Sequence, residues 1–518
     1  MIQNQREVWT TRLGLILAVA GNAIGLGNFL RFPVQAADNG GGAFMIPYMV
    51  SLILIGIPLV WVEWALGRYG GERGHGTAIA VFDYIWKKPY AKYIGILGVM
   101  IPLVVVIYYV YIESWTLAYS FFSLIGSIPH EAINSSVKDY LKPFEQFLVS
   151  FIGADSKSSL FLTPSASAYI FFLITMLINS YILYRGVSAG IEKVARIAMP
   201  TIFILAIILL IRVFTMTSPE GRNFLDGLGF LWNPDFSALS NPKVWLAAAG
   251  QVFFTLSIGF GAILTYASYL KPKSDIALNG LAGASVNEFA EVILGGSIAI
   301  VASVIFFGVM GTQEIAHEGA FNLGFIAMPA IFANTPFGSL FGFIWFLLLF
   351  FAGVTSSIAL SQPAVAFLED EFGLKREKAI LYLMGFVFIT AHIVIFMKGV
   401  LDELDFWVGT LALVLFALLE AVLFMWIFGS EKAWAELNKY ADIHIPKIFY
   451  YIMKYISPLF LIVILISWTI DTLPAKFSEN SLNVWIARLF ILFVLLIGII
   501  LVKIAWKKRG EKNGRTSS

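Results

Sequence analysis

AVAGNAIGLGNFLRFP, residues 18–33, contains three glycines, two asparagines and an arginine within an apolar segment. Its tetrapeptide IGLG (24–27) recurs almost letter for letter as IGFG (258–261) inside a second apolar segment. Each glycine weakens a helix by about 1 kcal/mol relative to alanine, so both segments are predicted to be interrupted helices. An interruption within lipid persists only where the freed backbone groups line a polar cavity. Close helix packing through small residues is the alternative for either motif alone.

The composition indicates a membrane protein. Of the 518 residues, 59% are hydrophobic and 13% are charged, whereas soluble domains average about 25% charged residues. The mean hydropathy is +0.82. A net charge of only +2 argues against a nucleic-acid partner. The apolar composition indicates that the protein is surrounded by membrane lipid. Cysteine is absent, which excludes disulfides, thiol nucleophiles and cysteine-ligated metals.

Apolar runs of spanning length predict an all-α integral membrane protein with twelve transmembrane helices. The first run is interpreted as a retained membrane segment, because polar residues interrupt it and no cleavage site follows. A further apolar run, 321–332, is too short to span and is interpreted as a re-entrant segment or a helical lid. The predicted helices are 13–37, 43–70, 90–124, 167–184, 191–214, 243–269, 277–307, 338–369, 378–397, 400–427, 448–472 and 483–506.

The two glycine motifs lie in the first and sixth helices, which enter the membrane from opposite faces. This arrangement predicts a 5+5 inverted repeat with discontinuous helices 1 and 6. A single transporter domain, 1–518, would then comprise a first five-helix repeat (13–214), a second inverted repeat (243–427) and two additional helices (448–506). Most Lys and Arg residues fall on the side of the termini, which predicts cytoplasmic termini.

The two breaks have the chemistry to hold a cation beside an anionic group. Freed carbonyl groups suit a hard cation, and freed N–H groups at a half-helix end suit a carboxylate. A zwitterionic amino acid with Na⁺ fits this pair better than a sugar or a lipid. Oxygen donors lie nearby, although Ser and Thr in membrane helices more often bond their own backbone. These donors are Asn22, Asn28, Thr255, Ser257, Asn287 and residues 355–357.

Acidic residues within the apolar segments are the next candidates, because buried carboxylates in membranes are costly and often functional. Glu63, Glu113 and Glu420 are interpreted as structural, whereas Glu288 and Glu291 lie beside Asn287 at a spacing that places one of them near the ion region. The five histidines are scattered singly. The sequence has no nucleophile–base arrangement and no metal-ligand spacing typical of an enzyme, so no enzymatic activity is predicted.

Seven motifs spread over the chain closely resemble those of one family. They are WTTRLGL (9–15), GNAIGLGNFLRFP (21–33), NGGGAF (39–44), IYYVYIESW (107–115), FFTLS (253–257), LFFAG (349–353) and LDFW (404–407). The chain resembles the neurotransmitter:sodium symporter family, in its bacterial leucine-transporting branch. The match covers nearly the whole chain.

The resemblance implies two sodium ions. The first would be held by Ala23, Asn28, Thr255, Asn287 and the substrate carboxylate. The second would be held by Gly21, Ile24, Ala352, Thr355 and Ser356, with only backbone carbonyls available from the first three.

The resemblance also implies an amino-acid site. The backbone near Ala23 and Gly27, together with the Tyr109 hydroxyl, would receive the carboxylate. Monoamine carriers of the family have an aspartate where Gly25 stands, so amino acids are favoured over amines. Leu360 replaces the isoleucine of the leucine transporter. The implied substrate-binding residues are Ala23, Gly25, Leu26, Gly27, Val105, Tyr109, Phe254, Thr255, Ser257, Phe260, Ser356 and Leu360.

Charged residues complete what the resemblance implies. Chloride-dependent members have a neutral residue where Glu291 stands, so the Glu291 carboxylate would make chloride unnecessary. Arg31 and Asp405 resemble an extracellular gate pair, and Arg6 and Asp370 resemble a cytoplasmic one.

The function expected from these residues is sodium-coupled symport of neutral, aliphatic or hydrophobic L-amino acids by alternating access. The location implied is a bacterial inner (plasma) membrane. The alternative is a membrane sensor that binds an amino acid without transporting it. A passive channel is disfavoured, because a channel has no need for gates that occlude the substrate. The preferred amino acid, the sodium stoichiometry, any proton antiport and a homodimer are left open.

Overall fold

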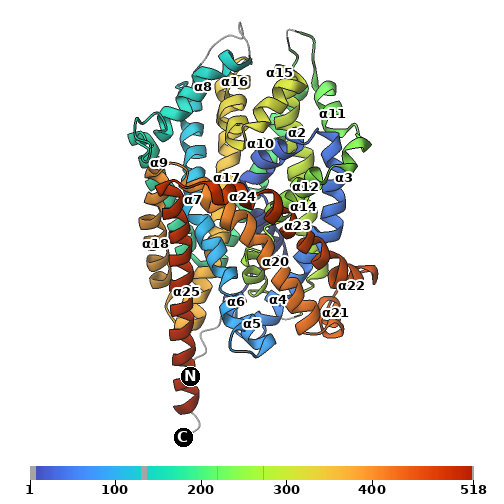
Figure 1. The fold of residues 1–518 in the computed structure, drawn as a ribbon, viewed down its shortest axis with the longest axis vertical. Coiled ribbons are helices and arrows are strands. Elements are labelled where there is room, and N and C mark those ends of the chain that lie inside the picture. The colour runs from blue at the N-terminus through green and yellow to red at the C-terminus, as the bar shows by residue number, and fades with distance from the viewer. Residues whose placement is uncertain (1–6, 130–136, 219, 272, 516–518) are drawn as a thin grey trace.

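The computed structural model describes residues 7–129, 137–218, 220–271 and 273–515, and most of them are helical. Figure 1 shows a bundle of long helices with shorter helices at both ends. Within the described ranges there is no β-strand, only two isolated β-bridges. The all-α fold class is therefore confirmed.

In the described part of the chain, ten helices are long and apolar enough to cross a membrane, and the bent pair Arg12–Ala23 (α1) and Gly27–Asp38 (η1 and α2) makes an eleventh span. The predicted sixth helix is divided into α12 (Pro242–Thr255) and α13 (Ala262–Ala267), each too short to span alone. Counted as one broken span, this pair completes the twelve predicted helices. The ten unbroken spans are Gly42–Gly71, Ala91–Leu124, Ala166–Tyr184, Val187–Phe214, Ala277–His317, Gly338–Phe372, Arg376–Phe396, Val400–Ile427, Ile448–Asp471 and Leu482–Arg509.

Most predicted ends agree with the structure to within a few residues. The seventh helix was expected to end at residue 307, and within α15 (Ser297–His317) the helical backbone is interrupted there, at Gly308, whose φ is 72°. A second helical segment follows Gly308. The apolar run 321–332 forms the short helical stretch Asn322–Ala333. Several short helices lie in predicted loops, because they are too short or too polar to register as spans. They are α5 (Ala78–Trp86), α8 (Val137–Ile152), α11 (Phe224–Trp232), α21 (Ser430–Asn438) and α24 (Leu473–Ser478).

The two broken spans and the long helices α7 (Leu97–Leu124) and α17 (Gly338–Phe372) together line one cavity. These two helices form the most extensive helix–helix contact in the described structure. α1 packs on α17, and α13 packs on both α17 and α4 (Ile57–Gly71). Each break is therefore enclosed by helices on several sides, as an interruption at membrane depth requires.

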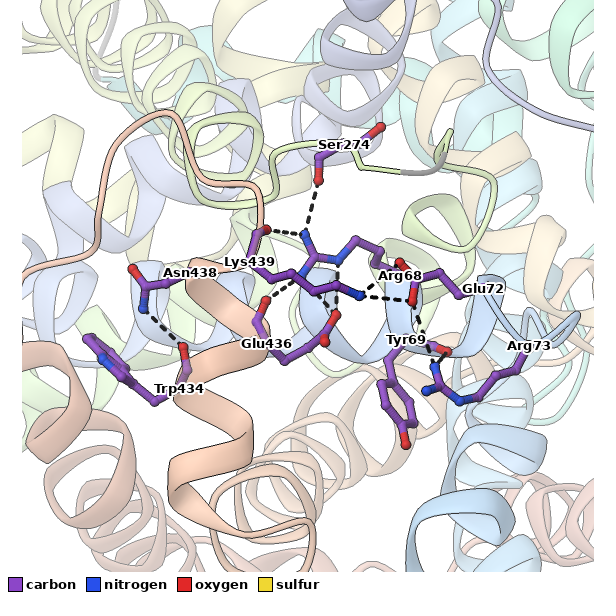
Figure 2. Close-up of polar contacts among 9 residues, drawn as sticks. All are labelled: Arg68, Tyr69, Glu72, Arg73, Ser274, Trp434, Glu436, Asn438 and Lys439. Atoms are coloured by element: carbon purple, nitrogen blue, oxygen red, sulfur yellow. Dashed lines mark hydrogen bonds and ion pairs between the residues drawn. The ribbon is translucent and has the colours of Figure 1, made fainter.

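A buried arginine ties together the end of the bundle where α1 begins. Arg68, at the end of α4, is only 2% exposed and donates two bonds to the Glu436 carboxylate, at 2.8 and 3.1 Å. It also donates to the backbone carbonyls of Ser274 (3.0 Å), Lys439 (2.9 Å) and Glu436 (Figure 2). The guanidinium thus joins α4 to α21 and to the loop that follows α13, with all its donors satisfied.

Candidate functional site

The first break is held open by side chains. α1 ends at Ala23, and Ile24 turns to an extended conformation with ψ of 100°. The N–H of Gly25 donates to Asn28 Oδ1 at 2.8 Å, and the N–H of Leu26 donates to the Tyr109 hydroxyl at 3.1 Å. Two backbone donors are therefore bonded to side chains, one to Asn28 of the same span and one to Tyr109 of α7, and a competing acceptor can replace these partners.

The second break adopts a backbone conformation that favours glycine. Ser257, Gly259 and Gly261 all have positive φ, at 54°, 79° and 69°. A Cβ atom on Gly259 would lie 2.4 Å from the Leu413 carbonyl oxygen, and one on Gly261 would lie 2.4 Å from the Gly98 carbonyl oxygen. Only glycine fits these two positions.

The two breaks face each other across a small cavity between α7 and α17. The Ser257 hydroxyl donates to the Asn22 carbonyl at 3.0 Å, which joins the breaks directly. The cavity has a volume of about 30 Å³, enough for one or two water-sized molecules. An amino acid therefore requires the movable side chains around it, such as Phe254, to shift.

The structure brings the predicted substrate-binding residues together. All of them except Leu26 line this one cavity, and Asn22 and Asn28 line it as well. Leu26 contributes its N–H to the Tyr109 hydroxyl instead. Among the lining residues none carries a charged side chain, and Val105, Phe260 and Leu360 make one wall apolar.

Buried oxygen atoms cluster at the predicted first sodium position. Asn28 Nδ2 lies 2.8 Å from Asn287 Oδ1 and 3.3 Å from Thr255 Oγ1, and Asn287 Nδ2 lies 2.9 Å from the same hydroxyl. All three residues are at most 1% exposed, and Ala23 is 8% exposed. Neutral oxygen donors shielded from water are the ligands that a hard cation such as Na⁺ prefers, so this set fits the ion.

A second group of oxygens lies on the other side of α1, at the predicted second sodium position. The Ser356 hydroxyl approaches the carbonyls of Gly21 (3.4 Å) and Ile24 (3.5 Å). Thr355 Oγ1 lies 3.1 Å from the Ala352 carbonyl. A Cβ on Gly21 would come within 3.1 Å of the Thr355 side chain, so glycine allows this close approach of α1 to α17. The donor set again suits Na⁺.

Glu291 extends the first group with a carboxylate. It is fully buried, and its Oε2 accepts from Asn28 Nδ2 at 3.2 Å. Its Oε1 accepts from Gln251 Nε2 (2.8 Å) and from the Tyr48 hydroxyl (3.2 Å). The neighbouring acid, Glu288, accepts from Tyr48 at 2.8 Å and from Asn287 Nδ2 at 3.5 Å. Of the two acids, Glu291 is therefore the one that contacts Asn28.

The predicted outer gate residues contact their neighbours rather than each other. The Arg31 guanidinium carbon lies 4.2 Å from the centre of the Phe254 ring, a cation–π contact. Asp405 Oδ1 accepts from the Tyr108 hydroxyl at 2.7 Å. Among the described residues, no ion pair within 4.0 Å joins Arg31 to Asp405, so the outer pair stays a prediction.

On the opposite side, Arg6 lies outside the described residues, and its pairing with Asp370 stays a prediction. Asp370 Oδ2 accepts from the Gly76 N–H at 2.9 Å. The buried Trp9 packs edge-on against Tyr266 and donates to its carbonyl at 2.9 Å. Trp9 and Tyr266 thus join the segment before α1 to α13 through a buried aromatic contact.

Glu63 was interpreted as structural, and its contact is of that kind: its Oε1 accepts from the Gly259 N–H at 2.6 Å and so supports the second break. Gln251 and Tyr48, which surround Glu291, were not singled out. Their position within apolar helices was the only signal available.

The comparisons agree with this geometry. The model of the sodium:neurotransmitter symporter family matches residues 6–152 and 161–509. A sodium-dependent transporter of Methanocaldococcus jannaschii is 31% identical over 96% of this chain and 98% of its own length. The sodium-dependent serotonin transporter of Drosophila melanogaster is 29% identical over 90% of this chain and 76% of its own length.

Among solved structures, MhsT in complex with L-phenylalanine matches with a TM-score of 0.75 and 29% identity, covering 89% of this chain and 99% of that one. The broken helices and the family match together define a sodium-dependent membrane transporter. The chain belongs to the sodium:neurotransmitter symporter family.

Proposed function

We propose that this protein couples Na⁺ to the symport of neutral, hydrophobic L-amino acids by alternating access, with no need for chloride. The observation that carries the proposal is the pair of facing breaks, which enclose one uncharged cavity between two groups of buried oxygens. A zwitterion and small cations match this arrangement.

The substrate carboxylate is assigned to the first break. The N–H groups after Ile24 lie at the N-terminal end of the outer half-helix, where the helix dipole favours an anion. The Tyr109 hydroxyl, now 3.1 Å from the Leu26 N–H, adds a donor. A sodium ion held by Asn28, Thr255 and Asn287 would neutralise the same carboxylate. The substrate ammonium group suits the free carbonyls at the end of α12.

The side-chain preference follows from the rest of the cavity. Gly25 offers no carboxylate to a monoamine, and no lining side chain is charged. Val105, Phe254, Phe260 and Leu360 favour an apolar side chain. The match to a protein solved with L-phenylalanine supports an amino-acid substrate.

Glu291 supports chloride independence. A fixed carboxylate that contacts Asn28 places negative charge beside the first sodium group, where an added anion would be repelled. Two sodium ions, one for each oxygen group, are the proposed stoichiometry.

The proposed location is a bacterial inner membrane, with both termini in the cytoplasm. The start of α1 and the end of α25 (Leu482–Arg515) support placing the termini on one side. Arg12 pairs with Asp442 beside α21, and Trp506 bonds Asp83 of α5. Both α21 and α5 lie at the same end of the bundle (Figure 1). Trp9, packed on Tyr266, would then be part of the cytoplasmic closure.

The test is a competition panel of amino acids against labelled leucine in proteoliposomes with Na⁺ outside. We expect neutral hydrophobic amino acids to compete and charged amino acids and monoamines to fail. Replacing chloride by gluconate should leave uptake unchanged, and replacing Na⁺ by K⁺ should abolish it. Uptake that persists in K⁺ would contradict the proposal, and saturable Na⁺-dependent binding without uptake would indicate a sensor.

A further inference from the structure

The last helix, α25, is joined to the bundle by polar contacts near its two ends. Near its start, the Arg488 Nε donates to Glu403 Oε1 at 2.6 Å. Near its other end, the Trp506 Nε1 donates to Asp83 Oδ2 at 2.7 Å. Only 17% of the apolar, membrane-spanning stretch of this helix is buried. In Figure 1 the helix runs along one edge of the bundle, beside α7 and α18 (Arg376–Phe396).

Behind the middle of α25 lies an apolar cavity of about 200 Å³. It is bounded by Met100 of α7, Phe367 of α17, Phe386 of α18, and Gly498 and Leu501 of α25. Tyr382 is the one lining residue with a polar group, and at 58% exposed it marks where the cavity opens to the surface.

The shape and chemistry of this cavity suit a hydrocarbon chain. On α7 it extends from Ile96 to Leu103, a length of about 10 Å at 1.5 Å per residue. It runs parallel to spanning helices and opens on a surface that faces lipid. An apolar cavity of this kind does not hold water, and its walls would lose dispersion contacts if it stayed void.

Positive charge gathers at one mouth of the cavity. Lys378 precedes Tyr382 by one helical turn on α18, and Lys508 follows Leu501 by two turns on the same face of α25. The Lys508 Nζ lies 5.5 Å from the centre of the Phe372 ring, at the end of α17. Lys378 and Lys508 are both exposed.

The acidic groups near this mouth are mostly paired already. Glu371 is bound by Arg509 at 2.7 Å, and Asp83 is contacted by Lys92 at 3.9 Å. Glu377 is exposed on α18 beside Lys378. The two lysines therefore remain available for an anion.

We propose that this cavity binds an anionic phospholipid, with one acyl chain behind α25 and its phosphate between Lys378 and Lys508. Basic clusters beside spanning helices attract anionic headgroups, and the apolar cavity supplies the specificity for a chain. A second copy of the protein is a poorer occupant, because it would bring two lysine-rich helix ends together.

The proposal can be tested with a phosphatidylglycerol that carries a photoactivatable diazirine in one acyl chain. The full chain is reconstituted in nanodiscs with this probe or with the matched phosphatidylcholine, and labelled peptides are mapped by mass spectrometry. We expect labelling to concentrate on α25 near Gly498 and on α18 near Phe386, several-fold stronger with phosphatidylglycerol.

Two sets of variants separate the cavity from the headgroup site. Gly498→Leu should reduce labelling several-fold, since a Cβ there already lies 3.0 Å from Ile96. Gly385→Leu is the matched control, because a Cβ there meets no atom within 4 Å. Lys378→Gln with Lys508→Gln should remove the preference for phosphatidylglycerol, whereas Lys447→Gln, at an exposed residue beside α22 (Ile448–Tyr451), should not.

Equal labelling of the wild type by both lipids would overturn the headgroup site. Labelling unaffected by Gly498→Leu would overturn the cavity, provided that Na⁺-dependent amino-acid binding shows the variant to be folded. If Gly498→Leu does not fold, Gly498→Ala replaces it, with a smaller reduction expected. Crosslinks between two copies at α18 and α25 would show that a second copy covers this face instead.

Discussion

The two broken helices share a sequence motif but are held in different ways. At the first break, Asn28 and Tyr109 satisfy the N–H groups of Gly25 and Leu26 through side chains. At the second, Gly259 and Gly261 adopt positive φ and lie directly against backbone carbonyls. The first break therefore has donors that a ligand can take over, and the second is a fixed frame against which the ligand is held.

The largest effect should come from a methyl group at the second break. Gly259→Ala would place its Cβ 2.4 Å from the Leu413 carbonyl oxygen at a φ of 79°. The left-handed backbone alone costs about 1–2 kcal/mol for alanine, and the overlap adds to it. We expect a lower melting temperature in detergent and no amino-acid binding.

Gly25→Ala is the matched change at the first break. Its Cβ would meet only side-chain atoms, Ser356 Oγ at 2.7 Å and the Tyr109 hydroxyl at 2.9 Å. The variant should fold with nearly unchanged stability and bind the substrate more weakly. Equal loss of stability in both variants would show that the two breaks are held alike.

Next in size is the loss of the carboxylate behind the second break. Glu63→Leu leaves the buried Gly259 N–H without its acceptor at 2.6 Å, which costs about 1–3 kcal/mol. Thermal unfolding and uptake should show reduced stability and slower transport, with less change in sodium affinity. A variant as stable and as active as the wild type would show that Glu63 does not support the second break.

Changes to the side-chain network at the first break should alter the dependence of uptake on Na⁺ concentration. Asn28 contacts Asn287, Thr255 and Glu291, so Asn28→Ala should raise the half-saturating Na⁺ concentration about tenfold, equivalent to about 1.4 kcal/mol. The control is Asn322→Ala, which removes only bonds to Glu318 on the surface. It should leave the half-saturating Na⁺ concentration unchanged. If Na⁺ dependence is unchanged in Asn28→Ala, the first ion is held elsewhere.

A smaller effect is expected from the charge beside that network. Glu291→Ser removes the carboxylate that contacts Asn28 and Gln251 and introduces a neutral hydroxyl. Uptake by this variant should become stimulated by chloride several-fold, whereas wild-type uptake should be insensitive to it. Chloride dependence of the wild type would refute the proposed role of Glu291.

The smallest effect should come from the apolar wall. Leu360→Ile conserves volume, and such exchanges usually cost less than about 1.5 kcal/mol. The order of competing amino acids should change by a few-fold, with stability and Na⁺ dependence unaltered. A change in Na⁺ dependence as large as that of Asn28→Ala would contradict the separation between wall and ion groups.

The sequence was sufficient for the spans and for the breaks, because apolar runs and the repeated Ile-Gly-x-Gly are local signals. Contacts between side chains of different helices could not be predicted from the sequence. The hydrogen bond from Gly259 to Glu63 joins residues 196 positions apart, and no local sequence pattern predicts it. The contact of Arg31 with the Phe254 ring likewise depends on side-chain packing rather than on charge alone. Short helices such as α21 are too polar for a search based on apolar length.

Sodium-coupled symport is tested by measuring the simultaneous uptake of radioactive Na⁺ and labelled leucine into proteoliposomes at an imposed potential. A potential of −100 mV contributes about 2.3 kcal/mol per charge, so leucine should accumulate well above equilibration and should carry Na⁺ with it. Leucine entry that only equilibrates, or that proceeds without any accompanying Na⁺ entry, would contradict sodium-coupled symport.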